Sequence, residues 1–302
     1  MRLSRLLAVG LPFALVAIQW AAILALEVLA LERVFPYERH PGYNKLAGPG
    51  DAGLRDLELG IVRVPRDEEH TLRTEGREAV LVILGGACTV SMGEESWELV
   101  RTSVFTERAT ALYLPRHREC TLTAARPADV AVFMVPAGAD YLPRLIAQDQ
   151  VEQRVEGAGH FTRRVATIVG PEFPCNRLLV GETFIEPGEW SSYPPHKHDE
   201  DRYPEEVRLE AIAFYQIDPP QGFALQYLYT PDRSVNEAHV VRNDQAFVAA
   251  RGYHPVAGAP GYSVYYLWGM AGEGHVMRWS LDPDHVWVAR EEGLMERAAA
   301  SA

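Results

Sequence analysis

Two histidines one residue apart, His196 and His198, are the residues of this sequence best suited to chemistry. Alternate side chains of an extended strand share one face, so both imidazoles would point to the same place and Lys197 away from it. Neutral imidazole is the commonest protein ligand for a divalent metal. The alternative interpretation is a solvated patch on a loop. A third imidazole, His254, follows a tight Gly252-Tyr253 turn and favours a metal site.

Several runs of sequence around these histidines carry a family resemblance. They are WSSYPPHKHD (190–199), GF-x-LQ-x-LYT (222–230), RGYHPV (251–256), APGY-x-VYYL (259–267), MAG (270–272) and DPDHVW (282–287). On these runs the sequence resembles the 5-deoxy-glucuronate isomerase family of inositol catabolism. That family is similar to the 5-keto-4-deoxyuronate isomerases, and both are bicupins. The resemblance extends from Pro49 to Val288.

The resemblance implies a metal site made of His196, His198, His254 and a glutamate. The family's glutamate corresponds to Ala211 here, and Glu210 lies one residue earlier. A shift of one residue on a strand moves a side chain to the opposite face. Either a bulge lets Glu210 serve as the fourth ligand, or that ligand is missing. The implied cofactor is a divalent ion, with zinc expected and manganese or iron as alternatives.

The reaction implied by the resemblance is the aldose–ketose isomerisation of 5-deoxy-D-glucuronate to 5-dehydro-2-deoxy-D-gluconate. Glu210 and Tyr253 are the candidates for the base, and Arg251 and Arg278 for binding the substrate carboxylate. Two other classes stay open: a divergent cupin that binds a sugar acid without turnover, and a metal-dependent cupin oxygenase. Departures from the family at Gln226-Tyr227 and Trp268, besides Ala211, favour the first of these two.

Short apolar stretches punctuated by glycine or proline must position these residues, and this rhythm is typical of β-sandwiches and barrels. The expected strands are 57–64, 78–84, 88–92, 111–114 and 130–135 in the first half, and 177–185, 210–217, 224–229, 238–241, 245–249 and 264–268 in the second. The rhythm therefore predicts an all-β fold, and the family resemblance implies a bicupin, with two cupin-type β-barrels or sandwiches in one chain.

The expected domain organisation has four parts. An apolar segment covers residues 1–33, a metal-free cupin 50–140, a linker 141–165, and a metal-binding cupin 166–290. The first cupin is expected to be metal-free because its histidines, His70 and His117, are far apart. A short helix is expected in the linker at 142–150.

The stretch from Leu6 to Leu26 is apolar except for Gln19 and follows Arg2 and Arg5. It is long enough to span a bilayer as a signal anchor. A cleaved secretory signal is less favoured, because no small-x-small cleavage site follows. The favoured interpretation is an untranslated extension before a start near residue 34, since the family is cytosolic. We therefore expect a cytoplasmic enzyme, attached to a membrane only if residues 6–26 are a genuine anchor.

The composition limits the partners. A net charge of −12 argues against nucleic acid but not against a small anionic sugar acid, which local arginines can bind. The three cysteines, Cys88, Cys120 and Cys175, have no metal-like spacing and indicate reduced core thiols. The sequence leaves open whether the protein forms a homo-oligomer.

Overall fold

The computed structural model describes residues 32–291, and those from Arg33 onward belong to one compact unit. The regular secondary structure of this part of the chain is almost entirely β, which confirms the expected all-β class. The apolar stretch 6–26 lies outside the described residues. Between residues 32 and 291, no helix is both long and apolar enough to cross a bilayer.

The N-terminal half forms an eight-stranded antiparallel sheet in the order β2-β3-β8-β5-β7-β9, with β4 paired to β8 and β6 to β5. Its strands are β2 (Gly42–Ala47), β3 (Glu58–Val64), β4 (Glu69–Arg73), β5 (Arg77–Met92), β6 (Glu95–Arg101), β7 (Ala111–Leu114), β8 (Glu119–Pro136) and β9 (Arg144–Ile146). The long strands β5 and β8 lose register between Ile83 and Cys88. There Gly86 has φ +103°, and a Cβ would overlap the Pro127 carbonyl oxygen. This irregularity lets the sheet fold around an apolar core.

The C-terminal half contains a seven-stranded sheet in the order β1-β18-β15-β20-β12-β11-β10, a four-stranded sheet β13-β19-β16-β17 and the pair β14-β21. The strands are β1 (Val34–Pro36), β10 (Glu152–Glu156), β11 (Arg163–Val169), β12 (Leu178–Ile185), β13 (Trp190–Ser191), β14 (His196–Lys197), β15 (Glu210–Asp218), β16 (Phe223–Tyr229), β17 (Asn236–Arg242), β18 (Gln245–Val248), β19 (Val256–Gly258), β20 (Ser263–Ala271) and β21 (Ser280–Leu281), with the helix α2 (Val286–Glu291) at the end. Every stretch expected to be a strand lies in one to within a residue at either end, but the separate strands expected at 78–84 and 88–92 are a single strand, β5, because its pairing with β8 continues past Gly85 and Gly86 with register shifts.

Two segments join sheets that sequence reasoning did not assign to them. β1 precedes all strands of the N-terminal sheet but pairs with β18 in the C-terminal half. The expected linker 141–165 contains β9, which pairs with β7, and β10, which pairs with β11. The helix expected at 142–150 is wrong: the segment forms β9 and a single 3-10 turn at Gln148–Gln150.

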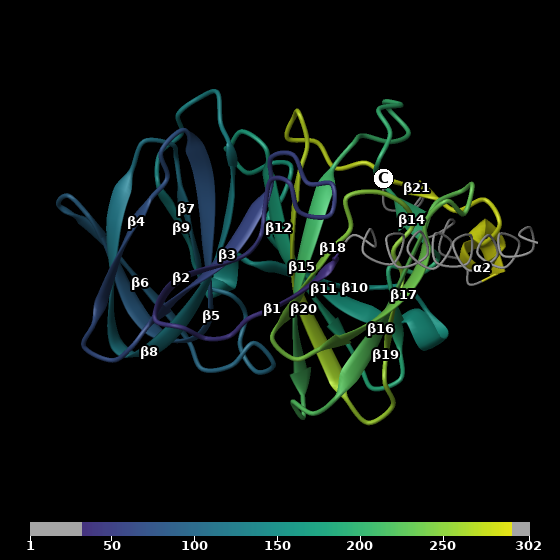
Figure 1. Cartoon of the computed structure of the whole chain (residues 1–302), viewed down its shortest axis with the longest axis horizontal. Coiled ribbons are helices and arrows are strands. Elements are labelled where there is room, and N and C mark those ends of the chain that lie inside the picture. Colours follow the sequence, from purple (N-terminus) through teal and green to yellow (C-terminus); the bar gives the residue numbers. More distant parts are fainter. Residues whose placement is uncertain (1–31, 292–302) are drawn as a thin grey trace, which may run out of the picture. The chain divides into compact units, whose positions relative to one another are not determined.

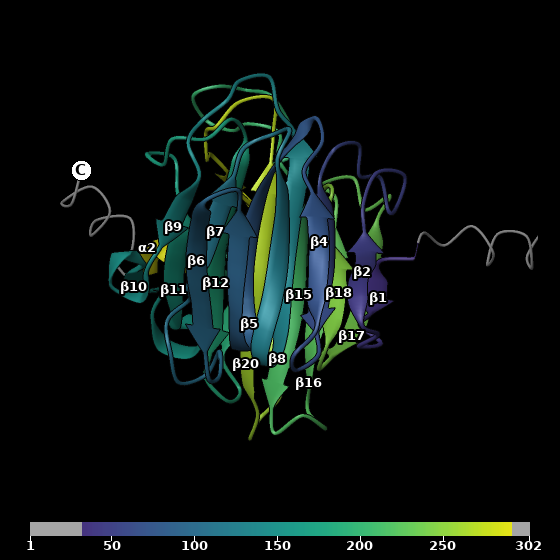
Figure 2. The same cartoon turned by 90° about the vertical axis from the view of Figure 1, so that its left-hand side faces the viewer.

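The two halves lie side by side in Figure 1, and a shared apolar core joins them. It contains Leu59 and Phe133 from the N-terminal sheet together with Val180 and Phe214 from β12 and β15. Gly269 of β20 lies so close to the Phe133 ring that any side chain there would overlap it. The strands β5 and β8 lie in front of β12, β15 and β20 in Figure 2, which views the same contact from the N-terminal side. The other face of β12, β15 and β20 is therefore free to carry a site.

Candidate metal centre and its cavity

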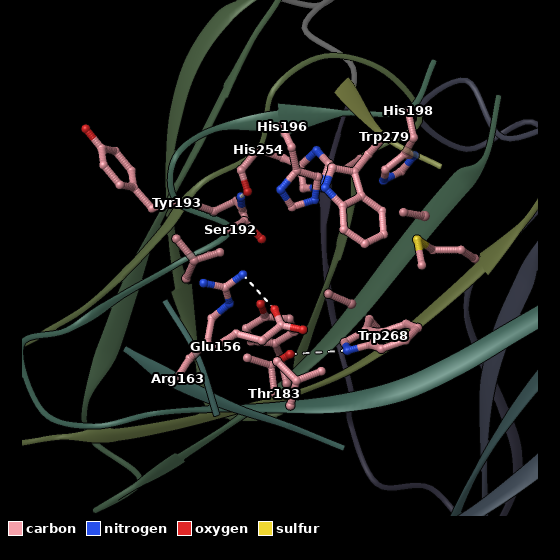
Figure 3. A pocket seen from close by; sticks show the side chains of 18 of the residues that line it. Glu156, Arg163, Thr183, Ser192, Tyr193, His196, His198, His254, Trp268 and Trp279 are labelled. Carbon is pink, nitrogen blue, oxygen red and sulfur yellow. Dashed lines mark hydrogen bonds and ion pairs between the residues drawn. The ribbon is translucent and has the colours of Figure 1, made fainter. Parts of the chain in front are cut away.

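The three predicted histidines lie together on one side of a cavity in the C-terminal half (Figure 3). His196 belongs to β14, His198 follows that strand, and His254 lies between β18 and β19. One ring nitrogen from each lies within 4.8 Å of the others. The ring centroids are 4.8 Å apart for His196–His254, 5.0 Å for His198–His254 and 6.2 Å for His196–His198.

Hydrogen bonds to the backbone orient two of these rings. The Nδ1 atom of His198 lies 2.9 Å from the carbonyl oxygen of Leu209, and that of His254 lies 2.9 Å from the carbonyl oxygen of Gly252. Because a carbonyl oxygen can only accept, both Nδ1 atoms carry the proton and donate it. In the neutral ring, Nε2 then has a free lone pair. A backbone carbonyl behind a ligating imidazole is the usual support of a metal-binding histidine.

Burial keeps the three imidazoles neutral. It lowers the pKa of His198, and it lowers the pKa of His196 well below its ordinary value, with His254 and His198 adding to the effect. Burial together with the neighbouring His198 lowers the pKa of His254 to about 3. Three neutral imidazoles, one buried and two half-buried, with donor nitrogens close together fit a divalent ion that takes nitrogen ligands.

Lys197 points away from the histidines, as the alternation predicts, but it is buried rather than exposed. Its Nζ atom donates to Asp199 at 2.6 Å and to Glu206 at 3.0 Å. The other carboxylate oxygen of Asp199 accepts the backbone N–H of Gly252 at 2.8 Å. Asp199 therefore ties the segment that carries His196 and His198 to the turn that carries His254. Sequence reasoning missed this link, because nothing in the spacing pairs residue 199 with residue 252.

Glu210 does not join the histidines. Its carboxylate accepts backbone N–H groups of Arg55 at 2.8 Å, Asp56 at 3.1 Å and Leu57 at 3.0 Å. The pairing of β15 with β20 has no register shift, so Ala211 faces the cavity and Glu210 the opposite side. The bulge that would have turned Glu210 inward is absent from this strand. Within residues 32–291, the cluster contains three histidines and no carboxylate.

The other predicted site residues also lie outside the lining of the cavity. The Tyr253 ring is buried against Tyr229, with 5.1 Å between centroids. Arg251 and Arg278 are exposed side chains that follow or precede the strands of the site. The structure therefore does not bring the candidate base Tyr253 or the candidate carboxylate-binding arginines to the histidines.

The cavity, about 440 Å³ in volume, instead has a charged cluster from β10 and β11. Glu156 lies between two arginines, 2.7 Å from Nε of Arg154 and 2.9 Å from Nη2 of Arg163. Figure 3 shows Arg163 and Glu156 across the cavity from His196 and His254. These residues were missed because their segment was interpreted as a linker. The alternation of Glu152, Arg154 and Glu156 on one strand face was the available signal.

Hydroxyl and amide groups complete the polar lining. The Tyr215 hydroxyl donates to Oε1 of Gln226 at 2.6 Å, and the Tyr266 hydroxyl lies 2.6 Å from the Ser191 hydroxyl. The Gln226 amide donates to the carbonyl oxygen of His254 at 2.9 Å. Gln226 therefore connects the floor of the cavity to the backbone that carries the third histidine.

Comparison with known proteins gives consistent matches over most of the chain. The sequence model of the KduI/IolB family matches residues 44–288. A 5-deoxy-glucuronate isomerase of Geobacillus kaustophilus is 41% identical over 224 residues, which are 72% of this chain and 81% of that protein. The protein of the same name from Bacillus subtilis strain 168 is 35% identical over 244 residues, 79% of this chain and 89% of that one.

Solved structures agree with these matches. An IolB-like protein of Salmonella typhimurium LT2 has a TM-score of 0.82 at 32% identity, covering 85% of this chain and 99% of that one. A variant of Bacillus subtilis oxalate decarboxylase has a TM-score of 0.60 at 10% identity, covering 86% and 83%. The second likeness concerns the fold alone.

Proposed function

Because the chain belongs to the KduI/IolB family, we propose that it is an aldose–ketose isomerase that converts 5-deoxy-D-glucuronate into 5-dehydro-2-deoxy-D-gluconate in myo-inositol catabolism. The observation that carries this proposal for the site is the convergence of three neutral histidines on one cavity. Its volume suits a six-carbon sugar acid. Since that substrate arises inside the cell, the enzyme would act in the cytoplasm.

We infer that His196, His198 and His254 hold the divalent ion, and zinc fits three imidazole donors with open positions. When bound, the ion supplies a Lewis acid for the carbonyl and hydroxyl oxygens of the substrate. The backbone carbonyls of Leu209 and Gly252 keep the two rings that they contact oriented toward the cavity.

Arg163, with Arg154 beside it, is the proposed binding group for the substrate carboxylate. Both guanidinium groups line the cavity, and Glu156 fixes them from one side. A guanidinium offers several donors in a plane, so Arg163 can bind Glu156 with one edge and a second carboxylate with another. This assignment replaces Arg251 and Arg278.

Glu156 is the proposed positioning group that holds Arg163 for the substrate carboxylate, and it lies across the cavity from the histidines that would hold the reacting end of the sugar acid. The isomerisation removes a proton from C2 and delivers one to C1, while the carbonyl and hydroxyl groups exchange places through an enediol and no net oxidation occurs. Glu156 is the only carboxylate that lines the cavity within the described part of the chain. Burial raises the pKa of Tyr215 well above its ordinary value, which leaves its phenol protonated and unsuited to removing the proton from C2.

Proton NMR of the full chain, loaded with zinc, in D₂O tests the function. We expect conversion of 5-deoxy-D-glucuronate to the ketose with deuterium at the new CH₂OH carbon. Glu156→Gln should raise KM for the sugar acid, since Arg163 loses the charged partner that holds it, with unchanged zinc content. Glu152→Gln, at the exposed start of the same strand, should behave as wild type.

Three outcomes would contradict parts of this account. Saturable binding of the sugar acid without ketose formation would indicate a cupin that does not turn over. Oxygen consumption with the sugar acid would indicate an oxygenase. A wild-type KM in Glu156→Gln would exclude Glu156 as the group that positions Arg163 and leave the isomerase function intact.

A further inference from the structure

The floor of the cavity is built from three rows of laterally paired residues on β15, β20 and β12. One row is polar: Tyr215, Tyr266 and Thr183 each carry a hydroxyl. The other two rows are apolar: they pair Ala213 with Trp268 and Gly181, and Ala211 with Met270. The floor therefore changes from hydroxyl-bearing to hydrocarbon within the length of one strand.

Trp268 is the largest side chain of the apolar part. Its ring lies over Gly181, where a Cβ would come within 2.2 Å of it, and Ala213 on the other side leaves it room. Its only polar atom, Nε1–H, donates to Oγ1 of Thr183 at 3.2 Å. Trp268 thus offers a ligand its ring and no free hydrogen-bonding group.

This surface does not match a fully hydroxylated ligand. A hydroxyl placed against Trp268, Ala213 and Met270 would lose its water and gain no partner from these side chains, which is unfavourable. A hydrocarbon group at the same place would leave water for an apolar surface, which is favourable. The opposite end of the cavity differs, because Arg163 offers charge there. Figure 3 shows Arg163 and Trp268 on opposite sides of the cavity.

We propose that the cavity also binds monocarboxylates with a hydrocarbon tail, with the carboxylate at Arg163 and the tail against Trp268, Ala213 and Met270. The carboxylate half of this inference rests on the proposed function, and the apolar half rests on the floor alone. The ligand class is that of short fatty acids, which share the carboxylate of the sugar acid and lack its hydroxyls.

Calorimetric titration of the zinc-loaded full chain with straight-chain carboxylates from butanoate to octanoate tests the proposal. Affinity should rise roughly fourfold per methylene, the factor expected when each CH₂ is buried. Trp268→Asn should reduce this increment to below about twofold, since a polar amide replaces the ring. Arg163→Met should weaken all chain lengths by a similar factor and leave the increment unchanged. Trp287→Ala, at an exposed position outside the cavity, is the matched control.

Affinity that does not rise with chain length in the wild type would overturn the inference, and this test needs no variant to fold. An affinity increment per methylene that survives Trp268→Asn would place the tail elsewhere. Binding that is indifferent to Arg163→Met would place the carboxylate elsewhere. Either result would also overturn the inference. The isomerase assay on the same preparation separates the two proposals. Absence of ketose together with the expected increment would refute the proposed function and support the apolar subsite.

Discussion

Glu78 and Glu210 hold corresponding positions in the two halves of the chain, and each carboxylate accepts three successive backbone N–H groups of the other half. Glu78, near the start of β5, binds Asn176, Arg177 and Leu178 at 2.7, 2.6 and 3.0 Å. Glu210, at the start of β15, binds the backbone that leads into β3. Both bound segments lead into an inner strand, β12 or β3.

This correspondence gives Glu210 a structural role in place of the metal-binding one considered from the sequence. Removing the acceptor leaves the buried N–H group of Leu57 without water or partner and the partly buried N–H groups of Arg55 and Asp56 without their bonds to Glu210. We expect Glu210→Ala to lower the free energy of unfolding by about 2–4 kcal/mol in urea titrations, and Glu210→Gln, which keeps an acceptor oxygen, to lower it less. Metal content should be unchanged in both variants. Loss of the metal from folded Glu210→Ala protein would return Glu210 to the metal centre.

Ala211 stands on the cavity side of β15, where the family resemblance places a metal-binding glutamate. An added carboxylate there would offer a fourth, charged ligand near the three histidines. Ala211→Glu should therefore tighten zinc binding by about tenfold or more, measured by competition with a chelator. Ala211→Gln is the control for size, and it should tighten binding far less. Equal zinc affinity in wild type and Ala211→Glu would mean that position 211 does not face the ion.

The buried carboxylate of Glu206 predicts how the stability of the fold depends on acid pH. Burial alone would raise its pKa, but hydrogen bonds from Ser280 and Lys197 outweigh it and lower the pKa from 4.5 to about 2. Because the folded-state pKa is depressed, Glu206 stabilises the fold above pH 4.5, and this contribution is lost as the pH falls toward 2. It amounts to on the order of 2–3 kcal/mol.

Chemical denaturation at a series of pH values measures this contribution. Glu206→Gln should flatten the decline in stability between pH 4.5 and 2 and lower stability at pH 7. Glu205→Gln, at an exposed neighbouring position, should keep the wild-type slope. Parallel pH profiles for Glu206→Gln and wild type would contradict the depressed pKa.

Variants of Arg163 and Arg251 test which arginine binds the substrate carboxylate: Arg163, proposed from the structure, or Arg251, expected from the sequence. Arg163 lines the cavity, whereas Arg251 is exposed outside it. Arg163→Met should raise KM for the sugar acid at least tenfold, since a charged hydrogen bond to the carboxylate is lost. Arg251→Met should leave KM within about twofold. The opposite pattern in steady-state kinetics would restore the sequence-based assignment.

The sequence predicted those features that depend on neighbouring residues of one segment, and it missed those that depend on contacts between distant segments. The orientation of His196, His198 and Lys197 follows from strand alternation alone, and β7 lies at its predicted bounds. Residues brought in by distant pairing were missed. Arg154 and Glu156 reach the cavity only because β10 pairs with β11, and Asp199 reaches Gly252 only through the fold. Glu210 was ambiguous because a bulge, which sequence cannot exclude, would have reversed its direction.

Zinc content and ketose formation, measured together on wild type and His254→Ala, test the central claim most directly. The account predicts about one zinc per chain in the wild type with conversion of 5-deoxy-D-glucuronate, and loss of both in a folded His254→Ala protein. His160→Ala, which removes a histidine with a 94% exposed side chain, should retain both. A folded His254→Ala protein that keeps its zinc and its activity would contradict the three-histidine centre.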